Sequence, residues 1–223
     1  MSVDGVLRVP YNIPGSPQWQ WINIYTRMSL ERIIFINRPI TDGLANSIIS
    51  SMLYLDSDDP GKPIYLYINS IGDPVSVGMA SPTMGMSSVM AALAIYDTMQ
   101  HISSEVATIC LGQAVGVAAL LLSSGTKGKR ASLPHANLAL SHPYSGTQGQ
   151  ASDIEINATQ VLSKRRSVVD ILAENTGQTQ EKLTEDMGRT FYMTPEEAKD
   201  YGLIDRVLES PKEAIAPQLQ TSA

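Results

Sequence analysis

A strand, a glycine-rich turn and an apolar helix follow one another between Ile109 and Ala119, and chemistry would be expected at this turn. In serine hydrolases, a tight turn of this kind lifts the nucleophile above the sheet and directs backbone N–H groups at the oxyanion. The residue at the tip is Gly116, which has no side chain that could act as a nucleophile. From spacing alone, the segment predicts only a tight connection between a strand and a helix.

Three histidines could supply an imidazole base. His142 lies beside Ser141, but adjacent side chains on a strand point to opposite faces of the sheet, so the two do not form a nucleophile–base pair. A bulge that re-aims the His142 ring is the open alternative. His135 is expected on a surface loop. His101 is expected at the end of a helix, where a positive charge suits the helix dipole.

Alternating strand and helix patterns must position these residues. Runs rich in apolar residues predict strands at residues 32–37, 63–69, 106–111, 136–140 and 203–208. Apolar residues at helical spacing predict a helix after an N-cap at Thr41 and further helices over residues 87–100 and 115–122. They also predict a helix from Ser152 to a C-cap at Gly177 and a last helix from Thr194. Such repeated units predict an α/β fold with a mostly parallel sheet covered by helices.

The helix that begins at Ser152 is the longest one predicted. Ser152 and Glu155 have the spacing of a capping box, as do Thr194 and Glu197 at the last helix. An apolar stripe runs along the long helix through Ile154, Val161, Leu162, Val168, Val169 and Leu172. The basic triplet at residues 164–166 fits a solvated face or, alternatively, charge pairing with another subunit.

Composition limits the class of protein. The formal net charge is −6 and the isoelectric point is near 5.0, which argues against nucleic acid as the main partner. The single cysteine, Cys110, cannot form an internal disulfide, and no cluster of cysteine and histidine suggests a metal site. No segment reads as a signal peptide or a membrane span. We therefore expect a cytoplasmic protein with no membrane association.

Beyond these patterns, the sequence resembles ClpP, the family of proteolytic subunits of the Clp protease, over about residues 22–209. The stretches that carry the resemblance are Ile22–Arg27, Glu31–Phe35, Ile64–Ser70, Ile95–Gln100, Gly112–Ala114, Gly125–Arg130, Gly149–Ile156 and Tyr201–Asp205. The resemblance implies a crotonase-like α/β spiral fold. It implies one domain over residues 21–209, with a protruding handle helix and an insertion near residues 74–90. Residues 1–20 and 210–223 are expected to be flexible arms.

The family's catalytic triad can be placed residue by residue, and each position is changed. The resemblance puts the family serine at Gly116, its histidine at Ser141 and its aspartate at Thr190. The oxyanion segment of the family corresponds to Gly72 and Asp73. A carboxylate at Asp73 would oppose the negative charge that such a segment must stabilise.

This combination resembles the ClpR branch of the family, whose members lack the triad and occur in oxygenic photosynthetic lineages. The resemblance implies mixed heptameric rings with active ClpP-type subunits, docking of an AAA+ Clp ATPase, unfolded proteins as substrates, and no cofactor. Matching positions for the ATPase-docking cleft are Leu53, Tyr65, Tyr67 and Leu133, and those for ring-to-ring contact in the handle are Gln148, Gly149 and Gln150. Without the resemblance, Tyr65 and Tyr67 could equally form one half-buried face of a strand. The competing hypothesis for function is a residual or re-purposed hydrolase that uses His142 or backbone N–H donors.

Overall fold

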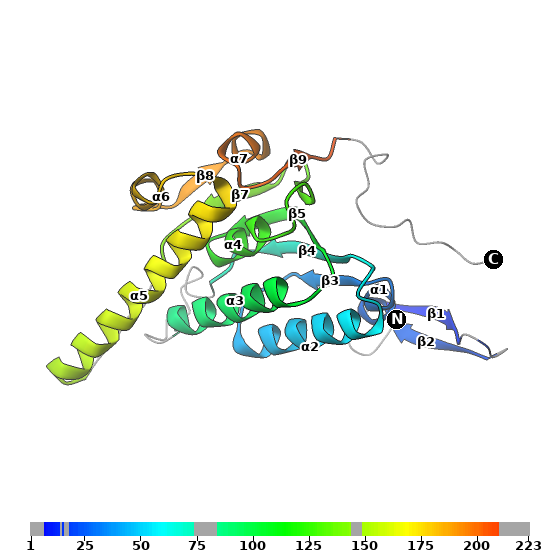
Figure 1. Ribbon diagram of the computed structural model, residues 1–223. Coiled ribbons are helices and arrows are strands. Elements are labelled where there is room, and N and C mark those ends of the chain that lie inside the picture. Colours follow the sequence, from blue (N-terminus) through cyan, green and yellow to red (C-terminus); the bar gives the residue numbers. More distant parts are fainter. Residues whose placement is uncertain (1–6, 14, 16–17, 74–83, 144–148, 210–223) are drawn as a thin grey trace.

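A mostly parallel sheet organises the chain (Figure 1). The computed structural model describes all residues except 1–6, 14, 16–17, 74–83, 144–148 and 210–223. The strands along the main path of the sheet are parallel, in the order β3 (Ile33–Ile36), β4 (Ile64–Ser70), β5 (Val106–Val115), β6 (Arg130–Ser132) and β9 (Arg206–Val207). The α/β class predicted from the sequence is confirmed.

Two further strands extend the sheet beside the end of β5. Strand β7 (Asn137–Leu140) pairs in parallel with Gln113–Val115 of β5, and β8 (Phe191–Met193) pairs antiparallel with β7. The sequence predicted that the strand would end at residue 111 and that Gly112 would start the turn, and this prediction was wrong. Because β7 supplies new pairing partners, β5 continues to Val115, and the turn falls at Gly116 instead.

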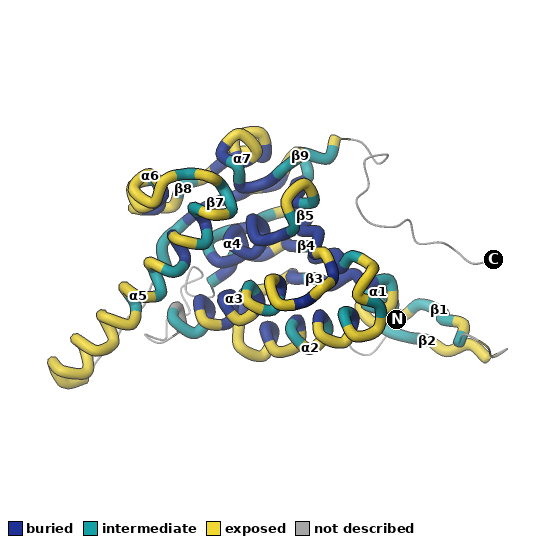
Figure 2. Tube along the Cα trace, viewed as in Figure 1, coloured by how far each residue is buried: buried dark blue, intermediate teal, exposed yellow. Residues whose placement is uncertain are grey.

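Helices cover one face of the sheet and enclose the main core (Figure 2). They are α2 (Asp42–Asp58), α3 (Met84–His101) and α4 (Val117–Ser123). The Thr41 hydroxyl accepts a hydrogen bond from the Leu44 N–H at 3.4 Å, as its position before α2 predicted. The first part of the expected insertion, residues 74–83, lies outside the described residues, and residues 84–90 form the first turns of α3.

The opposite face of the sheet carries a smaller apolar group. Its buried members, here called the outer cluster, are Ile33, Tyr65, Ala107, Ile109 and Ala131. The side chain of Met28, from helix α1 (Ile24–Leu30), packs against this cluster. Because strand residues alternate between faces, these side chains point away from the main core.

An antiparallel hairpin precedes α1. It consists of β1 (Arg8–Asn12) and β2 (Trp19–Asn23), so that β1 and the first two residues of β2 lie within residues 1–20, for which the sequence predicted an arm. Trp19 and Trp21 are more than half exposed, and their rings contact each other edge to face with centroids 5.7 Å apart. Backbone pairing therefore organises part of this segment.

The longest helix, α5 (Ala151–Thr176), projects from the body of the molecule (Figure 1). Val168, Val169 and Leu172 are buried, whereas Ile154 and Leu162 are exposed, so only the second half of the predicted stripe packs within this chain. Gly177 is the C-cap in the left-handed conformation, as predicted.

The predicted capping box at Ser152 is absent. Helix α5 begins one residue earlier, with Gln150 as its N-cap and no side-chain cap. The second predicted capping box, between Thr194 and Glu197, is confirmed at the start of α7 (Pro195–Tyr201). Helix α6 (Gln180–Asp186) lies between α5 and β8 in the sequence. Among the described residues, no helix is long and apolar enough to cross a membrane.

Candidate functional site

The turn between β5 and α4, here called the elbow, has a strained geometry. Gly116 at its tip has φ 56° and ψ −117°, a combination that glycine adopts readily and other residues adopt at a cost. Its N–H donates to the Ala139 carbonyl at 2.9 Å, and its carbonyl accepts from the Leu120 N–H at 3.1 Å. The tip is thereby anchored to both β7 and α4.

The structure brings two of the three predicted triad positions together. The Ser141 hydroxyl lies 3.0 Å from the point where a Cβ atom on Gly116 would be. Thr190 directly precedes β8, whose first residue, Phe191, pairs with Leu140, the residue before Ser141. Gly116 and Ser141 are far apart in the sequence, and the pairing of β5 with β7 brings them together at the elbow.

The segment that would provide oxyanion donors uses its N–H groups internally. The Gly72 N–H donates to the Ser70 hydroxyl at 3.0 Å, and the Asp73 N–H donates to the Ile71 carbonyl at 3.0 Å. Gly72 has φ 75°, and a Cβ atom there would collide with the Val115 carbonyl. Since both N–H groups are engaged, stabilising an oxyanion with them would require this segment to rearrange.

His142 faces away from the elbow. Its Nε2 lies 2.6 Å from Nη2 of Arg165 on α5 and 3.4 Å from the Thr184 carbonyl on α6. Burial, followed by the nearby Arg165 charge, lowers the pKa of His142 below its usual value of 6.5. The re-aimed ring that the sequence left open is not found, and the basic triplet contributes Arg165 to a contact within the chain. His135 is exposed and His101 ends α3, as predicted.

The predicted docking positions fall into two groups. Tyr65 belongs to the outer cluster, Tyr67 packs against it, and Leu133 is half-buried. Burial raises the pKa of Tyr67 above its usual value. Leu53 is 48% exposed on α2, which packs on the other face of the sheet, so the structure does not bring all four residues together within one chain.

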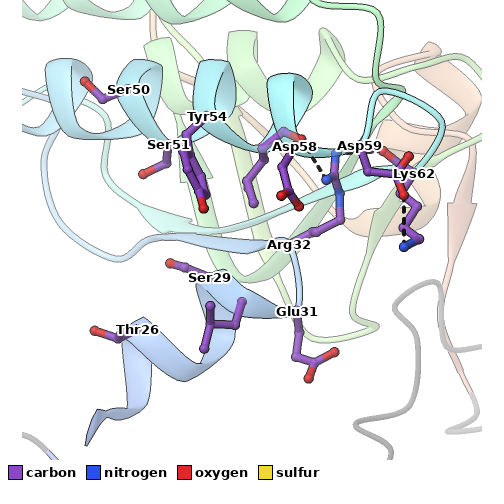
Figure 3. Close-up of a pocket in the computed structure, with 12 residues that line it drawn as sticks. Thr26, Ser29, Glu31, Arg32, Ser50, Ser51, Tyr54, Asp58, Asp59 and Lys62 are labelled. Carbon is purple, nitrogen blue, oxygen red and sulfur yellow. Dashed lines mark hydrogen bonds and ion pairs between the residues drawn. The ribbon is translucent and has the colours of Figure 1, made fainter. Parts of the chain in front are cut away.

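An open cavity of about 970 Å³ lies between α1 and α2 (Figure 3). Its lining combines hydroxyl groups, apolar side chains and carboxylates, among them Ser29, Leu30, Ser51, Tyr54 and Asp58. Arg32 also lines the cavity and is itself 8% exposed. Sequence reasoning missed this site because its residues are ordinary surface types, and only the packing of the two helices sets them around one space.

The cavity is held in shape by the Arg32 side chain. Its guanidinium donates to the carbonyls of Leu55, Lys62 and Pro63 and to the Ser104 hydroxyl, at 2.7 to 3.1 Å. These acceptors lie at the end of α2 and in the loops beside it, so a single side chain ties them together. Arg32 also has a positive φ of 63°, which is uncommon for a residue with a side chain.

The predicted ring-contact positions lie at the start of α5. Gln150 is the N-cap of this helix, Gly149 precedes it, and Gln148 lies outside the described residues. Within the described part of the chain, no three side chains of the metal-ligating types cluster as a metal site would require.

The fold and the elbow define the class of the protein. A strand–turn–helix elbow on a mostly parallel sheet, with two strand ends beside its tip, is the scaffold of a serine hydrolase. The chain belongs to the Clp protease family, whose sequence model matches residues 16–211.

Curated relatives support this assignment over nearly the whole chain. The chain is 49% identical to the ATP-dependent Clp protease proteolytic subunit 2 of Prochlorococcus marinus (strain NATL2A), over 94% of this chain and 98% of the relative. It is 48% identical to proteolytic subunit 3 of Parasynechococcus marenigrum (strain WH8102), over the same shares. Proteolytic subunit 3 of Synechococcus sp. (strain CC9605) is also 48% identical, again over 94% of this chain and 98% of the relative. The resemblance to ClpP subunits and the fold that it implied are confirmed.

Proposed function

We propose that this chain is a non-catalytic, ClpR-type subunit of the proteolytic core of an ATP-dependent Clp protease. The observation that carries the proposal is Gly116 at the tip of the elbow, where a serine protease of this design needs its nucleophile. Ser141, which lies beside the tip, and Thr190 offer neither an imidazole base nor a carboxylate to orient it. The engaged N–H groups of Gly72 and Asp73 support the same conclusion.

In this proposal the subunit contributes structure and contacts to a mixed heptameric ring with active ClpP-type subunits. On the projecting part of α5, the large apolar side chains of Ile154, Ile156 and Leu162 are exposed, and exposed apolar side chains of this kind are what subunit contacts cover. Leu53 would face Tyr65, Tyr67 and Leu133 of a neighbouring subunit, forming the cleft for an AAA+ Clp ATPase. Unfolded proteins would be degraded by the active neighbours, in the cytoplasm.

The test is labelling of the purified chain with a serine-reactive fluorophosphonate, measured by intact mass, beside an active ClpP as the control. We expect no adduct on this chain and a stoichiometric adduct on the control. An adduct on this chain would contradict the proposal, and its position would identify the activated serine.

Assembly is tested separately. The chain is mixed with an active ClpP-type subunit from the same source, and the particles are weighed by native mass spectrometry. Mixed rings are expected. Particles that contain only one kind of subunit would contradict the assembly part of the proposal but not the loss of catalysis.

The alternative, a re-purposed hydrolase that uses His142, has less support. The imidazole Nε2 is occupied by Arg165 and faces α6. A general base must reach the proton that it abstracts, and this ring faces away from the elbow.

A further inference from the structure

The base of the projecting helix α5 is tied to the domain through His142. Residues 151–160 are all exposed, and the first buried residue of the helix is Val168 (Figure 2). Arg165 lies between these two parts, and its Nη2 is 2.6 Å from Nε2 of His142 at the end of β7. Close to the C-terminal end of the helix, Asn175 also hydrogen-bonds to the body, through Arg130, Ser123 and Ser124. The contact between Arg165 and His142 therefore sits where the helix leaves the domain.

The 2.6 Å contact between Nη2 of Arg165 and Nε2 of His142 favours one tautomer of the imidazole. A guanidinium can only donate hydrogen bonds, so in this contact Nε2 is the acceptor. The ring is then neutral, with its proton on Nδ1. The Nδ1 atom is buried and has no hydrogen-bond partner among the described residues. A second proton on the ring would have to go to Nε2, and it would place an imidazolium against the guanidinium.

We propose that the contact between His142 and Arg165 is a pH-sensitive latch that holds the base of α5 against the domain and opens when His142 takes up a proton. The charged group that acts on the ring is Arg165 from α5, and it disfavours a second proton. From α6, the Thr184 carbonyl lies 3.4 Å from Nε2 and would accept a hydrogen bond from a protonated Nε2, which opposes burial and Arg165 but does not outweigh them. No carboxylate among the described residues contributes to stabilising the protonated ring. The proposal concerns contacts within one chain and does not depend on the proposed function.

The direction of the effect follows from linkage. The pKa of His142 is lowered in the closed form, first by burial and then by Arg165, whereas in an open form it would return towards 6.5. The open form therefore binds more protons at low pH, and the latch weakens as the pH falls below about 6.5. Going from about pH 7.5 to about pH 5.5, opening can increase by at most about tenfold, the limit for one imidazole of ordinary pKa.

The first measurement is an NMR titration of the histidine rings in the full-length chain. We expect His142 to be the neutral Nδ1–H tautomer at neutral pH, with a pKa below 6.5. Arg165→Gln should raise the pKa of His142 because it removes the positive charge. A His142 ring that carries its proton on Nε2, or that titrates at or above 6.5, would overturn the proposal without any variant.

The second measurement is amide hydrogen exchange of residues 161–172, corrected for the intrinsic effect of pH on exchange. Wild-type protein should exchange several-fold faster at about pH 5.5 than at about pH 7.5, within the tenfold limit. His142→Gln, whose amide can still accept a hydrogen bond from Arg165, should remove this difference, and the control variant His135→Gln should keep it. Light scattering at both pH values ensures that the compared particles have the same mass. A pH effect that persists in His142→Gln, or none in wild type, rules the latch out.

Discussion

The Ser141 hydroxyl lies 3.0 Å from the position that a Cβ atom on Gly116 would take. Gly116 follows β5, which began at Val106, and Ser141 follows a different strand, so their proximity comes from the pairing of β5 with β7. In the proposed assignment, these two positions are those of the nucleophile and its base in a serine hydrolase. The backbone at Gly116 has a conformation that is costly for residues other than glycine. Four predictions concern this backbone and the buried polar and charged side chains that stabilise the fold.

Gly116→Ala should destabilise the protein by about 1–3 kcal/mol, the usual cost of placing a side chain in such a backbone conformation. The new methyl group would also crowd the Ser141 hydroxyl. Urea unfolding measures the loss. Gly43→Ala is the matched control, because Gly43 has no positive φ and nothing within 4 Å of its added Cβ. It lies in the first turn of α2 and should change stability by less than about 1 kcal/mol, in the favourable direction. Equal stability of Gly116→Ala and wild type would show that the elbow is not strained.

Gly116→Ser should not create a peptidase, because Ser141 and Thr190 leave the new hydroxyl without a base. The triple variant Gly116→Ser, Ser141→His, Thr190→Asp should react with a fluorophosphonate roughly 10²-fold faster than the single variant, the lower end of what a general base contributes. The lower end is expected because the Asp73 N–H is already engaged. Peptidase activity in the single variant, or equal labelling of the two variants, would show that the three positions are wrongly assigned.

Arg32→Lys should destabilise the fold by at least about 2 kcal/mol, since a lysine cannot satisfy four acceptors and each buried group left unpaired costs roughly 1–3 kcal/mol. Thermal unfolding and urea unfolding both measure this loss. Arg27→Lys is the control, because Arg27 makes a surface ion pair with Glu31 that is worth only about 0.3–0.5 kcal/mol. Similar effects of the two substitutions would contradict the structural role of Arg32.

Asp205 and Arg130 form the best-buried ion pair of the described residues, with side chains 22% and 6% exposed. Burial raises the pKa of Asp205, but the hydrogen bonds from Arg130 and the N–H of Gly128 outweigh burial and hold it below its usual range. The stability from this pair is therefore complete above about pH 4 and is lost as the pH falls further.

Asp205→Asn should cost about 3 kcal/mol near neutral pH, because it leaves the Arg130 guanidinium buried without its counter-charge. Its unfolding free energy should also depend less on pH below about pH 4 than that of wild type. Glu105→Gln removes an exposed pair with Lys129 and should have a small effect, below about 1 kcal/mol. If the unfolding free energy of Asp205→Asn falls with pH below about pH 4 as steeply as that of wild type, other groups cause the dependence.

Local patterns were sufficient for most of the fold. The apolar runs at β3, β4 and β5 predict buried parallel strands because both of their faces are covered. Thr41, Thr194 and Gly177 predict helix ends because capping is a contact between near neighbours. The same local reasoning misplaced the end of β5, because the continuation of that strand depends on β7, which lies some twenty residues later in the sequence.

The sequence by itself identified the Clp protease fold, and it predicts that glycine, serine and threonine stand at the three positions where that family has its triad. The tertiary structure alone decided that Ser141 lies beside Gly116, that His142 contacts Arg165, and that α1 and α2 enclose a cavity lined by Arg32. Residue types and their short-range spacing can be read directly from the sequence. The distance between side chains that are far apart in sequence is set by strand register and helix packing, which local patterns do not specify.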